Sequence, residues 1–108
     1  YIVIMNLDQN SWVESVKNSK KRIVIDVRTI EEFCEGFIED AIHLNIYDSE
    51  SFMNGINKLN TNDHIHVYCR SGSRSSQACE IMKQLGLQNV YNLKGGILDW
   101  TGKIIKNN

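Results

Sequence analysis

Short runs of β-branched and aromatic residues alternate along the chain with segments in which apolar residues recur every three or four positions. The runs predict strands at residues 2–5, 23–27, 41–46, 64–68 and 90–93. The periodic segments predict helices near residues 8–18, 29–36, 48–59 and 74–85, with a short one near 97–100. Because strands and helices alternate throughout, we expect one three-layer α/β domain, with a mostly parallel sheet of about five strands and helices on both faces.

The same pattern predicts which side chains enter the core. Residues 23–27 form a nearly continuous apolar run, which is typical of a strand covered on both faces. The expected buried faces of the helices comprise Trp12, Val13 and Val16; Ile30, Phe33 and Phe37, with Cys34 alongside; Phe52, Met53, Ile56 and Leu59; and Ala78, Ile81, Met82 and Leu85. Cys34 and Cys79 are interpreted as core filler. Residues 1–103 are expected to form the domain, and 104–108 a frayed polar tail.

Local polar residues predict where two of the helices begin. Asp8 is a candidate N-cap for the first helix, although Ser11 followed by Glu14 forms a competing capping box one turn later. Thr29 and Glu32 form a capping box that opens the second helix.

Composition narrows the class of protein. A length of 108 residues suits one domain, and the net charge of -1 gives no overall attraction to nucleic acid or to an acidic membrane surface. No apolar run approaches the roughly 20 residues of a membrane span. Three cysteines without a Cys-x-x-Cys pair favour a reducing compartment, so we expect a cytoplasmic location. The chain opens at Tyr1 rather than Met, so we expect that a tag, a leader or a neighbouring domain was removed.

Cys69 stands where a predicted strand ends and a predicted helix begins. The first N–H groups of a helix have no partner within it, and the helix dipole makes that end partly positive. These groups, together with Arg70 and Arg74, would stabilise both a thiolate and an anionic substrate. A buried structural cysteine is the plainer interpretation, but two arginines and Gly72 within five residues favour a reactive thiol.

These residues also carry a resemblance to a known family. The stretch from Cys69 to Ser75, Cys-Arg-Ser-Gly-Ser-Arg-Ser, resembles the active loop of rhodanese-type sulfurtransferases, whose pattern is Cys-Arg-x-Gly-x-Arg followed by Ser or Thr. Residues 26–42 resemble the first signature of that family, through Asp-Val-Arg, Glu-Phe, Gly-Phe-Ile and Ala-Ile, and residues 93–100 resemble its C-terminal signature. Phe37 departs from the pattern, since the family usually has His there, and no proline follows Ile46.

The resemblance implies a sulfurtransferase that moves sulfane sulfur from thiosulfate, or a similar donor, to a thiophilic acceptor through a persulfide on Cys69. Its expected substrate-binding loop consists of Arg70, Ser71, Gly72, Ser73, Arg74 and Ser75. Asp26 and Arg28 are expected either to support this loop or to form a plain structural ion pair. The expected partners are a small anionic sulfur donor, a thiol or cyanide acceptor and a sulfur-relay protein, with neither nucleic acid nor membrane.

Other functions remain open from the sequence. One alternative is a sulfur-relay or binding module with little activity alone. Another is a phosphatase or arsenate reductase built on a cysteine loop, although only four residues separate Cys69 from Arg74, and tyrosine-phosphatase-like loops have five. His64 and His66 could share one face of a strand as a metal pair, but no third ligand lies nearby, and His43 has no acid partner within local reach. We therefore expect neither a metal nor another cofactor.

Overall fold

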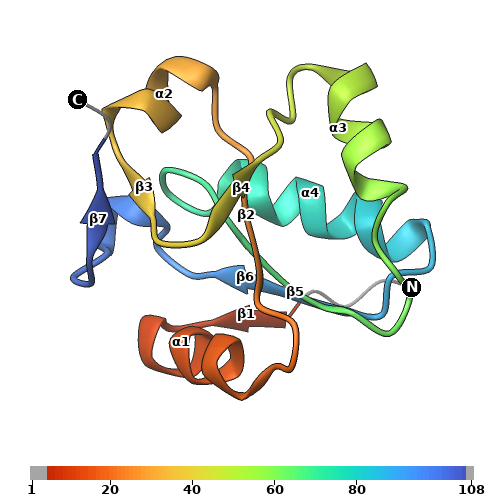
Figure 1. Ribbon diagram of the computed structural model, residues 1–108, viewed down its shortest axis with the longest axis horizontal. Coiled ribbons are helices and arrows are strands. Elements are labelled where there is room, and N and C mark those ends of the chain that lie inside the picture. The colour runs from red at the N-terminus through yellow and green to blue at the C-terminus, as the bar shows by residue number, and fades with distance from the viewer. Residues whose placement is uncertain (1–4, 107–108) are drawn as a thin grey trace.

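The centre of the protein is a five-stranded sheet in which all neighbouring strands run parallel (Figure 1). The computed structural model describes residues 5–106. In the order in which they lie across the sheet, the strands are β1 (Met5–Leu7), β6 (Asn89–Leu93), β5 (His64–Tyr68), β2 (Ile23–Asp26) and β4 (Ala41–His43). The predicted class of sheet is confirmed. The first predicted strand, at residues 2–5, lies mostly outside the described residues, and β1 continues to Leu7.

Four α-helices and one 3₁₀ turn connect the strands. They are α1 (Gln9–Asn18), α2 (Ile30–Glu35), α3 (Ser49–Ile56), α4 (Ser73–Gln84) and η1 (Ile97–Asp99). Asp8 caps α1, because its carboxylate accepts a 2.9 Å hydrogen bond from the Ser11 N–H, so the competing start at Ser11 is wrong. The capping box of Thr29 and Glu32 is present at the start of α2 and confirms that prediction.

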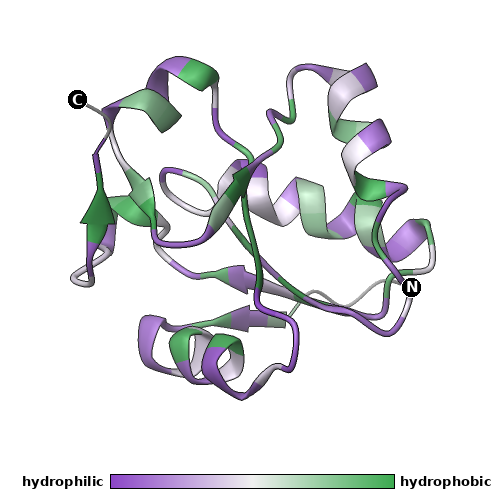
Figure 2. Ribbon diagram, viewed as in Figure 1, coloured by the Kyte–Doolittle hydropathy of each residue, from purple (hydrophilic) through white to green (hydrophobic). Residues whose placement is uncertain are grey.

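The two faces of the sheet are covered by different elements. On one face, α3 and α4 pack their apolar residues against Ile25, Ile65 and Val67. On the other face, α1 contributes the buried Trp12, and the C-terminal segment that includes η1 packs beside it. In Figure 2 the helices change repeatedly between hydrophobic and hydrophilic colours along their length, as expected of elements with one buried side. This arrangement confirms helices on both faces.

Three residues expected in the core lie at the surface. Ile30 is 51% exposed and Leu85 is 49% exposed, because the first opens the short helix α2 and the second is the C-cap of α4. Cys34 is exposed as well, so its interpretation as core filler is wrong. Cys79, in contrast, is fully buried.

A second, two-stranded sheet joins distant parts of the chain. Strand β3 (Phe37–Ile38) pairs antiparallel with β7 (Ile104–Ile105), so the expected frayed tail begins instead with a paired strand. The Ile38 N–H donates a 3.0 Å hydrogen bond to the Tyr68 hydroxyl, which ties β3 to the end of β5.

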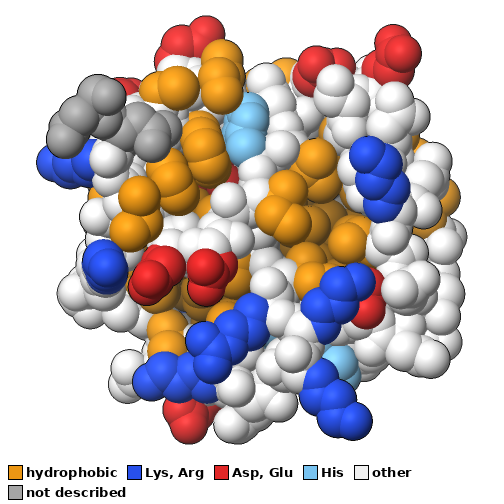
Figure 3. All heavy atoms as spheres, viewed as in Figure 1, with side chains coloured by type: hydrophobic (Ala, Val, Ile, Leu, Met, Phe, Trp, Pro, Cys, Tyr) orange, Lys and Arg blue, Asp and Glu red, His pale blue; other side chains and the backbone are white. Residues whose placement is uncertain are grey.

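Charged and apolar side chains are unevenly distributed on the surface. On the face drawn in Figure 3, hydrophobic side chains gather over α2, β3 and β7, whereas Lys and Arg side chains gather over α1. Among residues 5–106, no helix combines the length and the apolar character needed to span a bilayer.

Candidate active site

The cysteine loop lies at the carboxyl edge of the parallel sheet, between β5 and α4 (teal in Figure 1). Cys69 follows the last residue of β5 directly, and α4 begins at Ser73. Gly72 is the N-cap of α4 with φ 108°, a left-handed conformation that residues with a Cβ rarely adopt. The strand therefore carries the thiol to the helix start, and glycine makes the tight turn between them possible.

Hydrogen-bond donors converge on the Cys69 sulfur. The Gly72 N–H lies 3.1 Å from Sγ, and the Ser75 hydroxyl lies 3.3 Å from it. Burial raises the pKa of the Cys69 thiol, but hydrogen bonds from Ser75 and from the N–H groups of Gly72 and Ser71 outweigh burial and lower the pKa below its ordinary value. The site therefore stabilises the thiolate, the form of cysteine that acts as a nucleophile, more than the surroundings of an ordinary cysteine do.

The C-terminal glycine pair and η1 hold the backbone of this loop. The N–H groups of Ile97 and Leu98 donate to the carbonyl oxygens of Cys69 and Arg70, at 3.0 and 2.9 Å. A Cβ at Gly96, which has φ 61°, would collide with the Arg70 carbonyl group. Glycine is thus required at this point because two stretches of backbone approach each other closely.

The two loop arginines lie in different surroundings. The Arg74 guanidinium forms a bidentate ion pair with Glu32 of α2, at 2.7 and 3.0 Å. Its carbon Cζ also lies 5.8 Å from the centre of the Tyr47 ring. The Arg70 side chain is exposed and forms no ion pair with any carboxylate among residues 5–106. Of the two guanidinium groups, only that of Arg74 is therefore neutralised by a carboxylate among the described residues.

Asp26 and Arg28 form a buried network under α2. The Asp26 carboxylate is fully buried and accepts hydrogen bonds from the N–H and the guanidinium of Arg28. Arg28 also donates to the Gly36 carbonyl at 2.7 Å. Of the two expectations for these residues, the ion pair between Asp26 and Arg28 is present. Beyond the pair itself, the network reaches Gly36, between α2 and β3, and none of the hydrogen bonds described joins it to residues 69–75.

The histidines make structural hydrogen bonds. Nε2 of His43 lies 2.7 Å from the Arg28 carbonyl oxygen. His66 is fully buried, and His64 is exposed and bonds through Nδ1 to the Tyr91 hydroxyl at 2.9 Å. Within the described part of the chain, no three His, Cys, Asp or Glu side chains are grouped so that they could hold a metal ion.

Two contributors to the site escaped the sequence analysis. Glu32 was read only as a capping residue, because its partner Arg74 is 42 positions away. Asn92 donates to the Gly72 carbonyl at 3.3 Å and to the Asn6 side chain at 2.8 Å, which ties the loop to β6 and β1. In the sequence, the only indication that Asn92 has a structural role is that it is a polar residue inside an apolar run.

Comparisons with known proteins place the chain in a family. The model of the Rhodanese-like domain family matches residues 9–103. A sulfurtransferase of Allochromatium vinosum is 34% identical over 91% of this chain and 89% of its own length. A putative sulfur carrier protein of Bacillus subtilis is also 34% identical, over 93% of this chain, which spans only 52% of that relative.

A solved structure shares the fold. It is a rhodanese-like domain protein from Staphylococcus aureus, which superposes with a TM-score of 0.81 at 23% identity, over 97% of this chain and all of the other. The family match covers both the cysteine loop and the glycine pair that holds it. The chain therefore belongs to the rhodanese-like domain family.

Proposed function

We propose that the protein transfers sulfane sulfur through a persulfide on Cys69, with thiosulfate as a donor. The observation that carries this proposal is the set of donors around Sγ: the Gly72 N–H and the Ser75 hydroxyl lie within hydrogen-bond distance, and the thiol pKa is lowered. The same donors suit the negative charge of a persulfide. The sulfurtransferase of A. vinosum, similar over most of both chains, supports this class of reaction.

The proposed reaction has two steps. The Cys69 thiolate attacks the outer sulfur of thiosulfate, the bond between the two sulfur atoms of the donor breaks, and sulfite leaves with the electron pair. A thiophilic acceptor, such as cyanide or a cellular thiol, then attacks the outer sulfur of the persulfide and releases the Cys69 thiolate. Because neither leaving group requires a proton, the loop needs no general acid.

Mass spectrometry tests the proposal directly. After mixing with thiosulfate, the protein should gain one sulfur atom on Cys69, and cyanide should remove it. Cys69→Ser should gain none, while Cys34→Ser and Cys79→Ser serve as matched controls and should gain it. A protein that stays unmodified, or that carries the sulfur on Cys34, would refute the assignment.

A sulfur-relay module is the second candidate, favoured by the similarity to the putative sulfur carrier of B. subtilis. The relay would form the same persulfide but pass its sulfur to a partner protein rather than to a small acceptor. A single turnover with thiosulfate combined with failure to turn over repeatedly with cyanide would support it.

A cysteine-loop phosphatase is disfavoured. Asp26 is buried and engaged by Arg28, so it is not free to protonate a leaving group. We expect no hydrolysis of an aryl phosphate under conditions in which thiosulfate is turned over. Hydrolysis that depends on Cys69 would overturn this expectation.

A further inference from the structure

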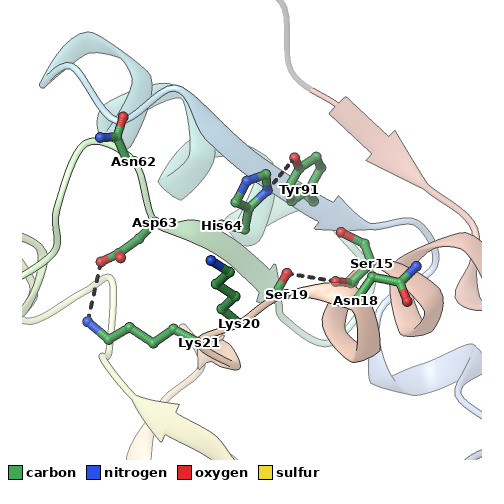
Figure 4. A pocket seen from close by; sticks show the side chains of 9 residues that line it. All are labelled: Ser15, Asn18, Ser19, Lys20, Lys21, Asn62, Asp63, His64 and Tyr91. Atoms are coloured by element: carbon green, nitrogen blue, oxygen red, sulfur yellow. Dashed lines mark hydrogen bonds and ion pairs between the residues drawn. The ribbon is translucent and has the colours of Figure 1, made fainter.

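A cavity of about 640 Å³ opens at the edge of the sheet opposite Cys69 (Figure 4). It is walled by the last turns of α1, the Lys20–Lys21 pair and the start of β5. The five residues of β5 separate this edge from Cys69, which at about 3.3 Å per residue is roughly 16 Å. The cavity is therefore separate from the cysteine loop, and it falls within the range of about 300–1,000 Å³ typical of small-molecule sites.

One positive charge in this cavity is uncompensated. Lys21 pairs with Asp63 at 3.5 Å. Lys20 forms no ion pair with a carboxylate of residues 5–106, and Figure 4 shows its ammonium group extending into the space between Asp63 and His64. The two lysines and one aspartate therefore leave a net charge of about +1, which favours an anion.

The two serine hydroxyl groups of the cavity donate their hydrogens to other groups of the protein. Nδ1 of the buried His66 lies 3.1 Å from the Ile23 carbonyl oxygen, which can only accept, so Nδ1 carries the proton. Nε2 is then an acceptor and takes the hydrogen of the Ser15 hydroxyl at 2.8 Å. The Ser19 hydroxyl donates to the Ser15 carbonyl at 2.7 Å. Both serine oxygens can act only as hydrogen-bond acceptors toward a ligand. They would therefore repel an anionic oxygen and accept a hydrogen bond from a ligand hydroxyl.

We propose that this cavity binds a small hydroxylated organic anion of the sugar-phosphate type. Lys20 meets the anionic group, and the Ser15 and Ser19 oxygens accept hydrogen bonds from ligand hydroxyls. The site is independent of the proposed sulfur transfer, because none of its residues contacts the cysteine loop in the hydrogen bonds and ion pairs described.

Amide NMR titration tests this proposal, with ribose 5-phosphate as the probe. The amide signals of Ser15, Ser19, Lys20 and His64 should shift and saturate. Inorganic phosphate should bind more weakly, because it carries fewer hydroxyl groups than ribose 5-phosphate to donate to the two serine oxygens, and ribose should give no saturable shift. Shifts confined to residues 69–76, or tighter binding of inorganic phosphate than of ribose 5-phosphate, would overturn the proposal.

Two charge variants sharpen the test. Lys20→Gln should weaken binding of ribose 5-phosphate roughly fivefold, as loss of an exposed charge pair does. The control Lys17→Gln, in the last turn of α1 and outside the cavity lining, should leave the affinity unchanged. Both variants should retain sulfur transfer, which verifies the fold. If the two substitutions weaken the binding of ribose 5-phosphate equally, the effect comes from the overall charge of the protein, and a site built around Lys20 is refuted.

Discussion

At the scale of single residues, the two arginines of the cysteine loop are expected to act differently. Arg74 is held by Glu32, whereas Arg70 is exposed and unpaired among the described residues. We predict that Arg70→Ala lowers kcat/KM for thiosulfate roughly tenfold, since it removes a charge-assisted contact, and that it flattens the dependence of kcat/KM on ionic strength. Arg74→Ala should also lower activity, together with the melting temperature.

Steady-state kinetics at several salt concentrations, combined with thermal unfolding, separate these effects. Glu31→Gln changes one charge on the exposed surface of α2 and is the control for nonspecific electrostatics. If kcat/KM depends equally weakly on salt in the Arg70→Ala and Arg74→Ala proteins, both guanidinium groups contact the sulfur donor, despite the ion pair between Arg74 and Glu32.

Ser75 tests how the thiolate is stabilised. Its hydroxyl is buried and lies 3.3 Å from Sγ. Ser75→Ala removes this donor while burial of the thiol persists, so we predict that the pKa of Cys69 rises toward that of an ordinary cysteine. The pH dependence of alkylation by iodoacetamide measures the pKa. Ser76→Ala is the matched control, and an unchanged midpoint for Ser75→Ala would leave the N–H groups as the stabilising donors.

The nucleophile was predictable from the sequence, but its environment was not. Cys69 could be found because a β-branched run ending at a cysteine, followed by turn residues and a helical period, is a local pattern. The ion pair between Glu32 and Arg74 depends on how α2 docks beside the start of α4, which no local pattern specifies.

At the scale of elements, η1 and the glycine before it fix the shape of the loop. Gly96→Ala should lower the free energy of unfolding by about 1–3 kcal/mol for its backbone conformation alone, because φ 61° with ψ -162° is a region that essentially only glycine adopts. The loss should be larger still because the new methyl group collides with the Arg70 carbonyl. Gly86→Ala is a matched control, since Gly86 has φ 96° but no atom within 4 Å of the added Cβ. Urea denaturation compares the two variants, and equal losses would show that the close approach adds nothing.

Sequence patterns predicted most elements and failed where an element is very short. Strand β7 has only two residues, and its pairing with β3 is set by tertiary contact across 66 positions rather than by its own sequence. Ile30 is exposed because it occupies the first position of a six-residue helix. The spacing of apolar residues does not predict the exact residue at which so short a helix begins.

At the scale of the whole molecule, His66 couples stability to pH. Burial lowers the pKa of His66 from 6.5 to about 4. Below pH 6.5 the unfolded chain therefore binds a proton that the folded protein does not, and stability falls by up to about 3 kcal/mol as the pH decreases toward 4. The pKa of Glu32, lowered to about 2 by its hydrogen bond with Arg74, adds a further loss only below its ordinary value of 4.5.

Unfolding by urea at several pH values between 7 and 4.5 measures this effect. In His66→Gln the amide can still pair with Ser15 and with the Ile23 carbonyl but does not titrate, so its stability should change less with pH over that range. Parallel pH dependences of the variant and the unmodified protein would contradict the prediction, whatever their absolute stabilities.

The hydrogen bonds from Ile97 and Leu98 to the cysteine loop also impose an order on biosynthesis. Strand β1 must wait for β6 before it can pair, and the loop must wait for η1 before its carbonyl groups are held. A nascent chain on the ribosome therefore carries Cys69 before the carbonyl groups of its loop have their partners. We expect the loop to reach its final shape only after residue 98 has left the exit tunnel, although the donors nearest to Sγ come from residues 72–75.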